Sequence, residues 1–164
     1  MKKLIFTFAL LLACCLAAQA QDYKTALGLR FGYPTSISFK HFISEPGAIE
    51  VFAGTARRSS FYRWTNLGLM YQHHSEISSA EGLRWYAGGG AAIYFWSYDN
   101  GLARRDDYGS TSLGVIGVLG LDYKFADIPL NLSVDWIPTL FLGDGYLDNF
   151  RPGYGALSAR YTFN

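Results

Sequence analysis

The stretch Leu130-Asn131-Leu132-Ser133-Val134-Asp135-Trp136 alternates apolar and polar residues without interruption. Successive side chains of a β-strand point to opposite faces, whereas a helix repeats its apolar residues every three or four positions. The stretch therefore predicts a strand with one apolar face and one polar face. Residues 27–33 near the start of the chain and residues 157–163 at its end show the same period.

Eight segments of this kind are expected along the chain, at residues 24–33, 35–43, 47–56, 61–73, 83–96, 110–125, 129–141 and 154–163. Compact turns with proline, Ser44-Glu45-Pro46-Gly47 and Ala126-Asp127-Ile128-Pro129, separate two pairs of them. Residues 97–109 and 142–153 form longer connections rich in Gly and Asp. Short periplasmic turns and longer outer loops are typical of transmembrane barrels. The pattern predicts an all-β fold, a closed antiparallel eight-stranded up-and-down transmembrane β-barrel.

Residues 1–20 are predicted to be a cleaved signal peptide, and residues 21–164 the barrel domain. Lys2 and Lys3 precede an apolar run, and Ala18-Gln19-Ala20 matches the small-residue pattern before a signal peptidase site. An alternative is a lipoprotein signal with Cys14 acylated. Both cysteines, Cys14 and Cys15, lie in the segment expected to be removed, so we expect no disulfide and no cysteine metal ligand in the mature chain.

Charge and length restrict the possible classes of protein. Removal of Lys2 and Lys3 changes the formal net charge from +1 to −1, which argues against nucleic-acid binding. After the predicted signal, no apolar run reaches the roughly 18 residues of a spanning helix. A chain of this kind can enter a membrane only as a closed barrel, because an open sheet would leave unpaired backbone groups in lipid.

The polar face decides between a membrane barrel and a soluble one. It carries eight charged residues, Arg30, Lys40, Glu50, Arg84, Asp122, Lys124, Asp135 and Arg160. Small residues lie between them, namely Gly28, Ser38, Gly54, Gly68, Gly88, Gly90 and Gly120. An eight-stranded barrel is only wide enough for side chains to fill it, so small residues there would make room for long charged ones. We expect this face to point inward, with the charges neutralising each other.

The apolar face is rich in aromatic residues near the strand ends. They are Phe31, Tyr33, Phe61, Trp64, Phe95, Tyr123, Phe125, Trp136, Tyr161 and Phe163. Rings at both interfaces form the aromatic girdles of outer-membrane barrels. We therefore expect these side chains to point outward, toward lipid.

Four stretches carry a family resemblance, Leu27–Pro34, Phe39–Phe42, Gly120–Phe125 and Ile128–Pro138. With them, the mature chain resembles the small outer-membrane β-barrel proteins common in Bacteroidota, and its architecture is similar to OmpX and OmpA-type barrels. The resemblance implies residence in the cell outer membrane and no agreed reaction. The closing segment Ala159–Asn164 resembles the signal by which the barrel assembly machinery recognises its precursors, although that signal usually ends on an aromatic residue and here Asn164 follows Phe163.

Three histidines, His41, His73 and His74, are the only candidates for an outer-membrane lipid-modifying site. His73 and His74 are adjacent on a predicted strand and so should point to opposite faces. His41 and one of the other two are expected near the periplasmic ends of their strands. Hydrogen bonding at the interface or in the interior is the expected role of these side chains, and no catalytic residue is assigned.

Four other motifs are judged not to form sites. Gly114-x-x-Gly117-x-x-Gly120 lies inside a strand and is no dinucleotide fingerprint; its glycines fit bends or large neighbours. Asp144–Asn149 lacks the spacing of an EF-hand, and Asn131-Leu132-Ser133 matches a glycosylation sequon in mid-strand. Arg104-Arg105-Asp106-Asp107 is interpreted as a solvated loop tip. No catalytic, cofactor-binding or metal-binding residue and no cofactor is predicted.

The expected function is that of a non-enzymatic outer-membrane barrel with a filled interior. Its expected partners are outer-membrane lipid and lipopolysaccharide, the barrel assembly machinery, and an extracellular partner at the outer loops, with no nucleic acid among them. One alternative is a lipid-modifying barrel enzyme that uses His41 or the pair His73 and His74. Another is a soluble periplasmic barrel that binds an apolar ligand, in which Leu132, Val134 and Trp136 would point inward.

Overall fold

The computed structural model describes residues 23–59, 62–98, 109–142, 150–152 and 154–163. Its strands are β1 (Thr25–Gly32), β2 (Thr35–Phe42), β3 (Gly47–Ser59), β4 (Tyr62–Glu76), β5 (Leu83–Tyr98), β6 (Gly109–Lys124), β7 (Leu130–Trp136), β8 (Thr139–Leu142), β9 (Phe150–Arg151) and β10 (Gly155–Phe163). The predicted signal peptide, with Cys14 and Cys15, lies outside the described residues. Its cleavage and the domain boundary at residue 21 therefore stay predictions.

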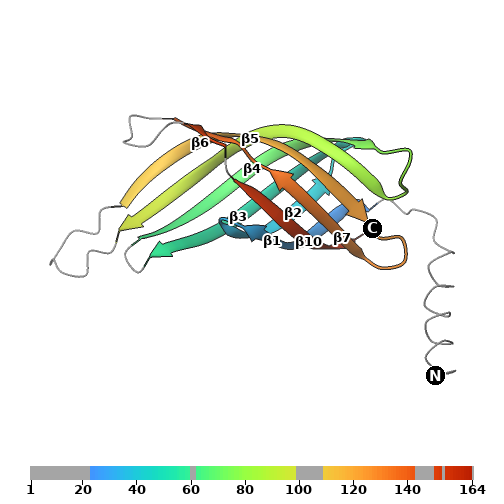
Figure 1. Cartoon of the computed structure of the whole chain (residues 1–164), viewed down its shortest axis with the longest axis horizontal. Helices are drawn as coiled ribbons and strands as arrows, with labels where there is room; N and C mark the ends of the chain where they lie inside the picture. The colour runs from blue at the N-terminus through green and yellow to red at the C-terminus, as the bar shows by residue number, and fades with distance from the viewer. Residues whose placement is uncertain (1–22, 60–61, 99–108, 143–149, 153, 164) are drawn as a thin grey trace, which may run out of the picture.

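The strands close into an antiparallel barrel (Figure 1). Each of β1 to β6 pairs with the next strand along the chain, and β10 closes the circle between β1 and β7. This confirms the predicted up-and-down topology. In the described part of the sheet, each of β1 to β7 and β10 has two hydrogen-bonded neighbours, so these strands present no free edge, while the short β9 pairs with β8 alone.

Ten strands make an eight-stranded barrel because two wall strands are each divided. β7 and β8 share one register against β6, with Leu119 opposite Trp136 and Ile116 opposite Thr139. Between them the Gly117 N–H donates to the Pro138 carbonyl at 2.9 Å. The predicted strand 129–141 is thus interrupted at Ile137–Pro138, since proline has no N–H to donate to the ladder. β9 and β10 likewise form the last wall strand, with one extra residue between them that shifts the register.

The two ends of the barrel differ. The turn end carries the connections 43–46, 77–82 and 125–129, together with the start of β1 and the end of β10. The opposite end, called the loop end, is where β1, β3, β5 and β8 end and where β2, β4, β6 and β9 begin. Among the described residues, no helix is long and apolar enough to cross a membrane.

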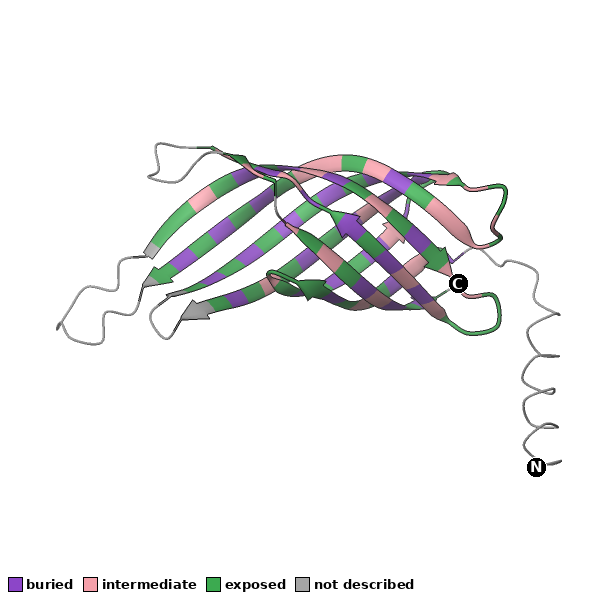
Figure 2. Ribbon diagram, viewed as in Figure 1, coloured by how far each residue is buried: buried purple, intermediate pink, exposed green. Residues whose placement is uncertain are grey.

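Burial alternates along each strand as the sequence period predicts (Figure 2). Leu29, Leu69 and Val134 are among the large apolar side chains on the outer wall, each about half exposed. Arg30, Lys40, Glu50, Asp122, Asp135 and Arg160 point inward and are buried. Buried charges inside a wall whose outer face is apolar are the reverse of what an ordinary soluble protein shows.

Three predicted positions need correction. Trp64 was expected on the outer wall but is buried inside, 1% exposed, because it has the same phase on β4 as the inward-facing Asn66 and Met70. Arg84 and Lys124 have the inward phase but lie at the turn end, half-buried. There Arg84 pairs with the exposed Glu76 at 3.2 Å, and the Lys124 ammonium donates to the carbonyls of Phe125 and Ile128.

The outward phase of the other described aromatic residues is confirmed for Phe31, Phe95, Tyr123, Trp136, Tyr161 and Phe163, all exposed. Tyr33, in the connection after β1, is 43% exposed, but its ring turns toward the interior and packs against Trp64. Phe125 follows the end of β6, is half-buried, and packs edge-on against Tyr123 with ring centroids 4.8 Å apart. Phe61 lies outside the described residues.

Candidate functional site

A network of buried charges fills the middle of the barrel around Glu50. Arg30 reaches Glu50 Oε1 at 2.5 Å through Nη1, and Arg160 reaches the same oxygen at 2.7 Å through Nη2. Ser38 Oγ donates to this oxygen as well, at 2.8 Å, while Gln72 Nε2 donates to Glu50 Oε2 at 2.7 Å. One carboxylate thus holds side chains from four different strands.

The network extends to the opposite wall through the two arginines. Arg30 Nη2 lies 2.8 Å from Asp135 Oδ1, and Tyr86 OH donates to Asp135 Oδ2 at 2.8 Å. Arg160 donates to Ser133 Oγ at 2.7 Å and to Ser38 Oγ at 2.8 Å. The contacts of Arg30 and Tyr86 with Asp135, and of Arg160 with Ser38, join strands that are not neighbours in the sheet, whereas the contact of Arg160 with Ser133 joins the paired strands β10 and β7.

A second group of buried polar residues lies nearer the turn end, around Asp122. Lys40 Nζ is 3.1 Å from Asp122 Oδ2, and Asn131 Nδ2 donates to Asp122 Oδ1 at 2.7 Å. Tyr23 OH also donates to this carboxylate, at 3.3 Å. The Lys40 ammonium lies 4.6 Å from the centre of the Tyr86 ring, a favourable cation–π position.

The buried charges balance, with three basic side chains facing three acidic ones. A buried ion is tolerated only when it is paired and its remaining donors or acceptors are satisfied. The predicted neutralisation of interior charges is therefore confirmed for six of the eight residues, the exceptions being Arg84 and Lys124 at the turn end.

Two glycines of the inner face, Gly68 and Gly120, make room for aromatic rings rather than for charged chains. A Cβ on Gly120 would lie 2.6 Å from Cζ of Tyr86. Gly120 stands between Tyr86 and Asp135 in the sheet register, so its missing side chain lets the Tyr86 hydroxyl cross to Asp135. A Cβ on Gly68 would likewise collide with the Phe52 ring.

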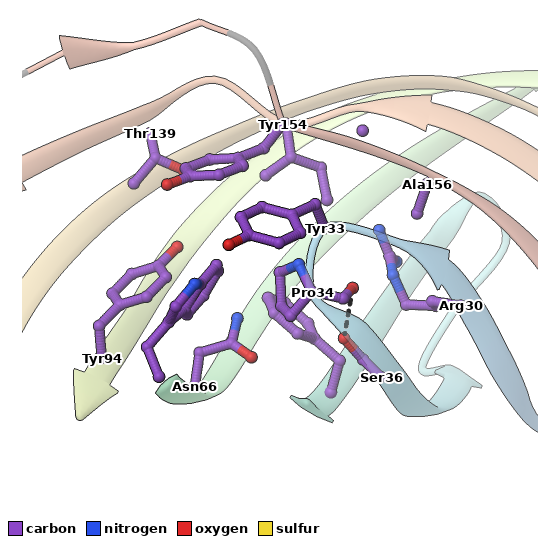
Figure 3. A pocket seen from close by; sticks show the side chains of 13 residues that line it. Arg30, Tyr33, Pro34, Ser36, Asn66, Tyr94, Thr139, Tyr154 and Ala156 are labelled. Atoms are coloured by element: carbon purple, nitrogen blue, oxygen red, sulfur yellow. Dashed lines mark hydrogen bonds between the residues drawn. The ribbon is translucent and has the colours of Figure 1, made fainter. Parts of the chain in front are cut away.

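A cluster of aromatic side chains closes the interior on the loop-end side of the charges (Figure 3). Trp64 lies at its centre, with ring centroids 5.5 Å from Tyr94, 5.4 Å from Trp96 and 5.6 Å from Tyr33. Tyr154 also lies against it, at 6.0 Å. The rings come from β4, from β5 and from the ends of β1 and β10, so the cluster ties four wall strands together at this level.

Beside this cluster is a small cavity of about 30 Å³ with Arg30 at its inner side. Asn66 and Thr139 line it, and both Asn66 Oδ1 and Thr139 Oγ1 are buried without a partner in the described part of the chain. A cavity of this size holds one or two water molecules. Its volume is too small for an organic ligand.

The three histidines lie in three different environments. His41 is half-buried on the outer face, where its Nδ1 lies 2.9 Å from Thr25 Oγ1. His73 is exposed on the outer face, and His74 points inward and is 2% exposed. The prediction that His73 and His74 point to opposite faces is confirmed. Among described residues, no group of three or more His, Cys, Asp or Glu side chains is placed to bind a metal ion.

The other sequence motifs have structural roles or lie outside the described residues. Gly114, Gly117 and Gly120 lie inside β6 beside Tyr94, Pro138 and Tyr86, as expected for glycines next to large neighbours. Asn131 is buried in the interior and bonded to Asp122, which leaves no room for a glycan. The segments 104–107 and 144–149 lie outside the described residues, as does Asn164.

No protein-family model matches the sequence, and no curated protein matches it significantly. Two solved structures are similar in fold. The N-terminal β-barrel domain of OprF from Pseudomonas aeruginosa is 13% identical with a TM-score of 0.64, covering 85% of this chain and 95% of that domain. Neisserial surface protein A (NspA) is 17% identical with a TM-score of 0.61, covering 85% of this chain and 93% of NspA. At this identity the likeness establishes the barrel fold alone.

Proposed function

We propose that this protein resides in the bacterial outer membrane as a non-enzymatic barrel, with a filled interior and a loop end available for surface contacts. The outer wall carries the proposal. Leu27, Leu69, Leu119 and Val134 on four separate strands are each about half exposed, in a wall of large apolar side chains. Exposed apolar surface of that extent is stable only when lipid or another partner covers it.

The soluble alternative requires the opposite orientation of the faces. Its ligand would contact Leu132, Val134 and Trp136 from inside the barrel. In the structure Val134 and Trp136 are exposed on the outer wall and Leu132 is half-buried there, while Ser133 and Asp135 are buried inside. The orientation therefore favours the membrane barrel.

A non-enzymatic role is supported by the distribution of the nucleophilic and basic groups. The histidines lie on two faces, and the buried carboxylates Glu50, Asp122 and Asp135 are bonded to basic side chains. A general base needs a carboxylate or imidazole within reach of a substrate. The paired interior carboxylates are unavailable for this role, since the same side chains fill the barrel.

The filled interior predicts that the reconstituted protein does not conduct ions. The aromatic cluster around Trp64 and the charged network around Glu50 occupy successive levels of the barrel, and an eight-stranded barrel has no room beside them. In planar lipid bilayers we expect a conductance equal to that of protein-free membranes, with a porin as positive control. Reproducible single-channel steps that scale with protein concentration would contradict a closed interior.

A further inference from the structure

A groove of about 540 Å³ lies on the outer wall over β10, between β1 on one side and the connection 125–129 with the start of β7 on the other. β10 is paired with both β1 and β7 in the sheet (Figure 1). Leu27, Leu29 and Phe31 line the side at β1, and Ile128 and Leu130 line the opposite side. The groove is thus part of the apolar wall, and its proposed role rests on the proposed function.

The groove exists because one outward position of β10 is small. Ala159 is half-buried on the outer face and belongs to the lining. The register places Leu29 of β1 and Leu132 of β7 on either side of it. Leu157 and Tyr161 are the next outward residues along β10. All four neighbours are much larger than a methyl group, so the wall is indented at Ala159.

The surface of the groove is almost entirely apolar. Gly28 and Arg160 lie beneath its floor with the inward phase, and the Arg160 guanidinium bonds to Glu50 inside the barrel at 2.7 Å. Tyr161 brings a hydroxyl, and the remaining side chains of the lining are hydrocarbon. A charged headgroup therefore finds no partner among the lining side chains, whereas a hydrocarbon chain matches them.

The shape of the groove favours one extended chain over the wall of a second barrel. Leu27 and Phe31 lie four residues apart on β1, a length of about 14 Å. In hydrocarbon, association depends on close packing rather than on exclusion of water, and a chain in a groove makes contacts at its sides as well as below. A second barrel would present another convex wall, which cannot follow the indentation down to Ala159.

We propose that this groove holds one acyl chain of a membrane phospholipid and retains it while the surrounding lipids exchange. The chain lies over Ala159, with the leucines of β1 on one side and Ile128 and Leu130 on the other. The connection 125–129 places the groove next to the turn end. Short turns of such barrels face the periplasm, so the chain belongs to a lipid of the periplasmic leaflet.

The test is native mass spectrometry of the folded protein in dodecyl maltoside micelles with added palmitoyl-oleoyl phosphatidylethanolamine. We expect one lipid to stay on each barrel after the detergent is stripped off. Ala159→Phe fills the groove and should lower lipid binding by about tenfold, which corresponds to the loss of roughly ten atom contacts. The matched control is Ala53→Phe, an exposed position on the outer face of β3 outside the groove, which should bind the lipid as the unmodified protein does.

Competition shows which part of the lipid is bound. Excess oleate should displace the phospholipid, whereas glycerophosphoethanolamine, which has the headgroup without the chains, should not. The proposal is overturned if glycerophosphoethanolamine displaces the lipid, if the two phenylalanine variants bind it equally, or if the spectrum shows a dimer in place of the lipid adduct. A barrel that inserts into membranes but carries no lipid overturns the acyl-chain site alone, whereas failure to insert overturns the proposed function.

Discussion

Replacement of Glu50 by leucine is expected to lower the free energy of unfolding by about 3–5 kcal/mol, the usual effect of removing one partner of a buried ion pair. Glu50 holds Arg30 and Arg160 with one oxygen and Gln72 with the other. Arg30 keeps Asp135 as a partner in the variant, but Arg160 loses its only salt bridge among the described residues. Urea unfolding of the barrel in lipid vesicles measures the change.

A second substitution makes this prediction specific. In the double variant with Glu50→Leu and Arg160→Met, the unpaired interior charge is removed, so we expect much of the lost stability to return, as for other buried pairs replaced by apolar residues. Glu81→Gln, an exposed carboxylate in the connection 77–82, should stay within about 0.5 kcal/mol of the unmodified protein. A Glu50→Leu variant as stable as Glu81→Gln would show that the network does not support the barrel.

An arginine in place of Leu69 is expected to destabilise the membrane-inserted barrel by about 2–4 kcal/mol, as a cation does at the middle of a bilayer. Leu69 lies at the centre of β4, points outward and is 55% exposed. Its side chain meets hydrocarbon if the wall is embedded in lipid. Folding titrations in phospholipid vesicles give the free energy, and the amount of assembled protein in cells should fall with it.

The matched control is Ile128→Arg. Ile128 is 46% exposed, similar to Leu69, but it lies in the connection 125–129 at the turn end. An arginine near the interface costs only about 0–1 kcal/mol. Equal effects of the two substitutions would contradict the assignment of the wall to lipid, since in water the two positions should tolerate arginine alike.

The period of the sequence was sufficient to predict the faces of the barrel. Alternation over residues 130–136 and 157–163 assigns Ser133, Asp135 and Arg160 to one side and Val134 and Tyr161 to the other, and the structure confirms it. This succeeds because side-chain direction in a strand depends only on position parity. A slip of one residue would turn every charge to the outside, so the register is strongly constrained.

The alternation of residue types does not tell how far along the barrel axis a residue lies. This explains the wrong predictions for Trp64, Arg84 and Lys124. Trp64 was placed outside because it lies near a strand end, although its parity matched that of Asn66. Arg84 and Lys124 have the parity of the interior but lie at the turn end, where they bond to Glu76 and to backbone carbonyls. For Trp64, its alternation with its strand neighbours would have predicted the inward orientation correctly. For Arg84 and Lys124, the position along the strand had to be known as well.

The partners across the interior were beyond sequence reasoning. Arg30 meets Asp135 across 105 residues of chain, and Arg160 meets Glu50 across 110. Such pairs depend on how far the strands are staggered when the barrel closes, a quantity that no local pattern encodes.

The most direct test of an outer-membrane barrel is electrophoresis of outer membranes from expressing cells, with and without boiling in detergent. A closed barrel has all its strand backbone groups paired and resists detergent until heated. We predict that the protein is found in the outer-membrane fraction and that its unboiled band migrates differently from the boiled one. Recovery in the soluble fraction, with one band position under both conditions, would contradict the account.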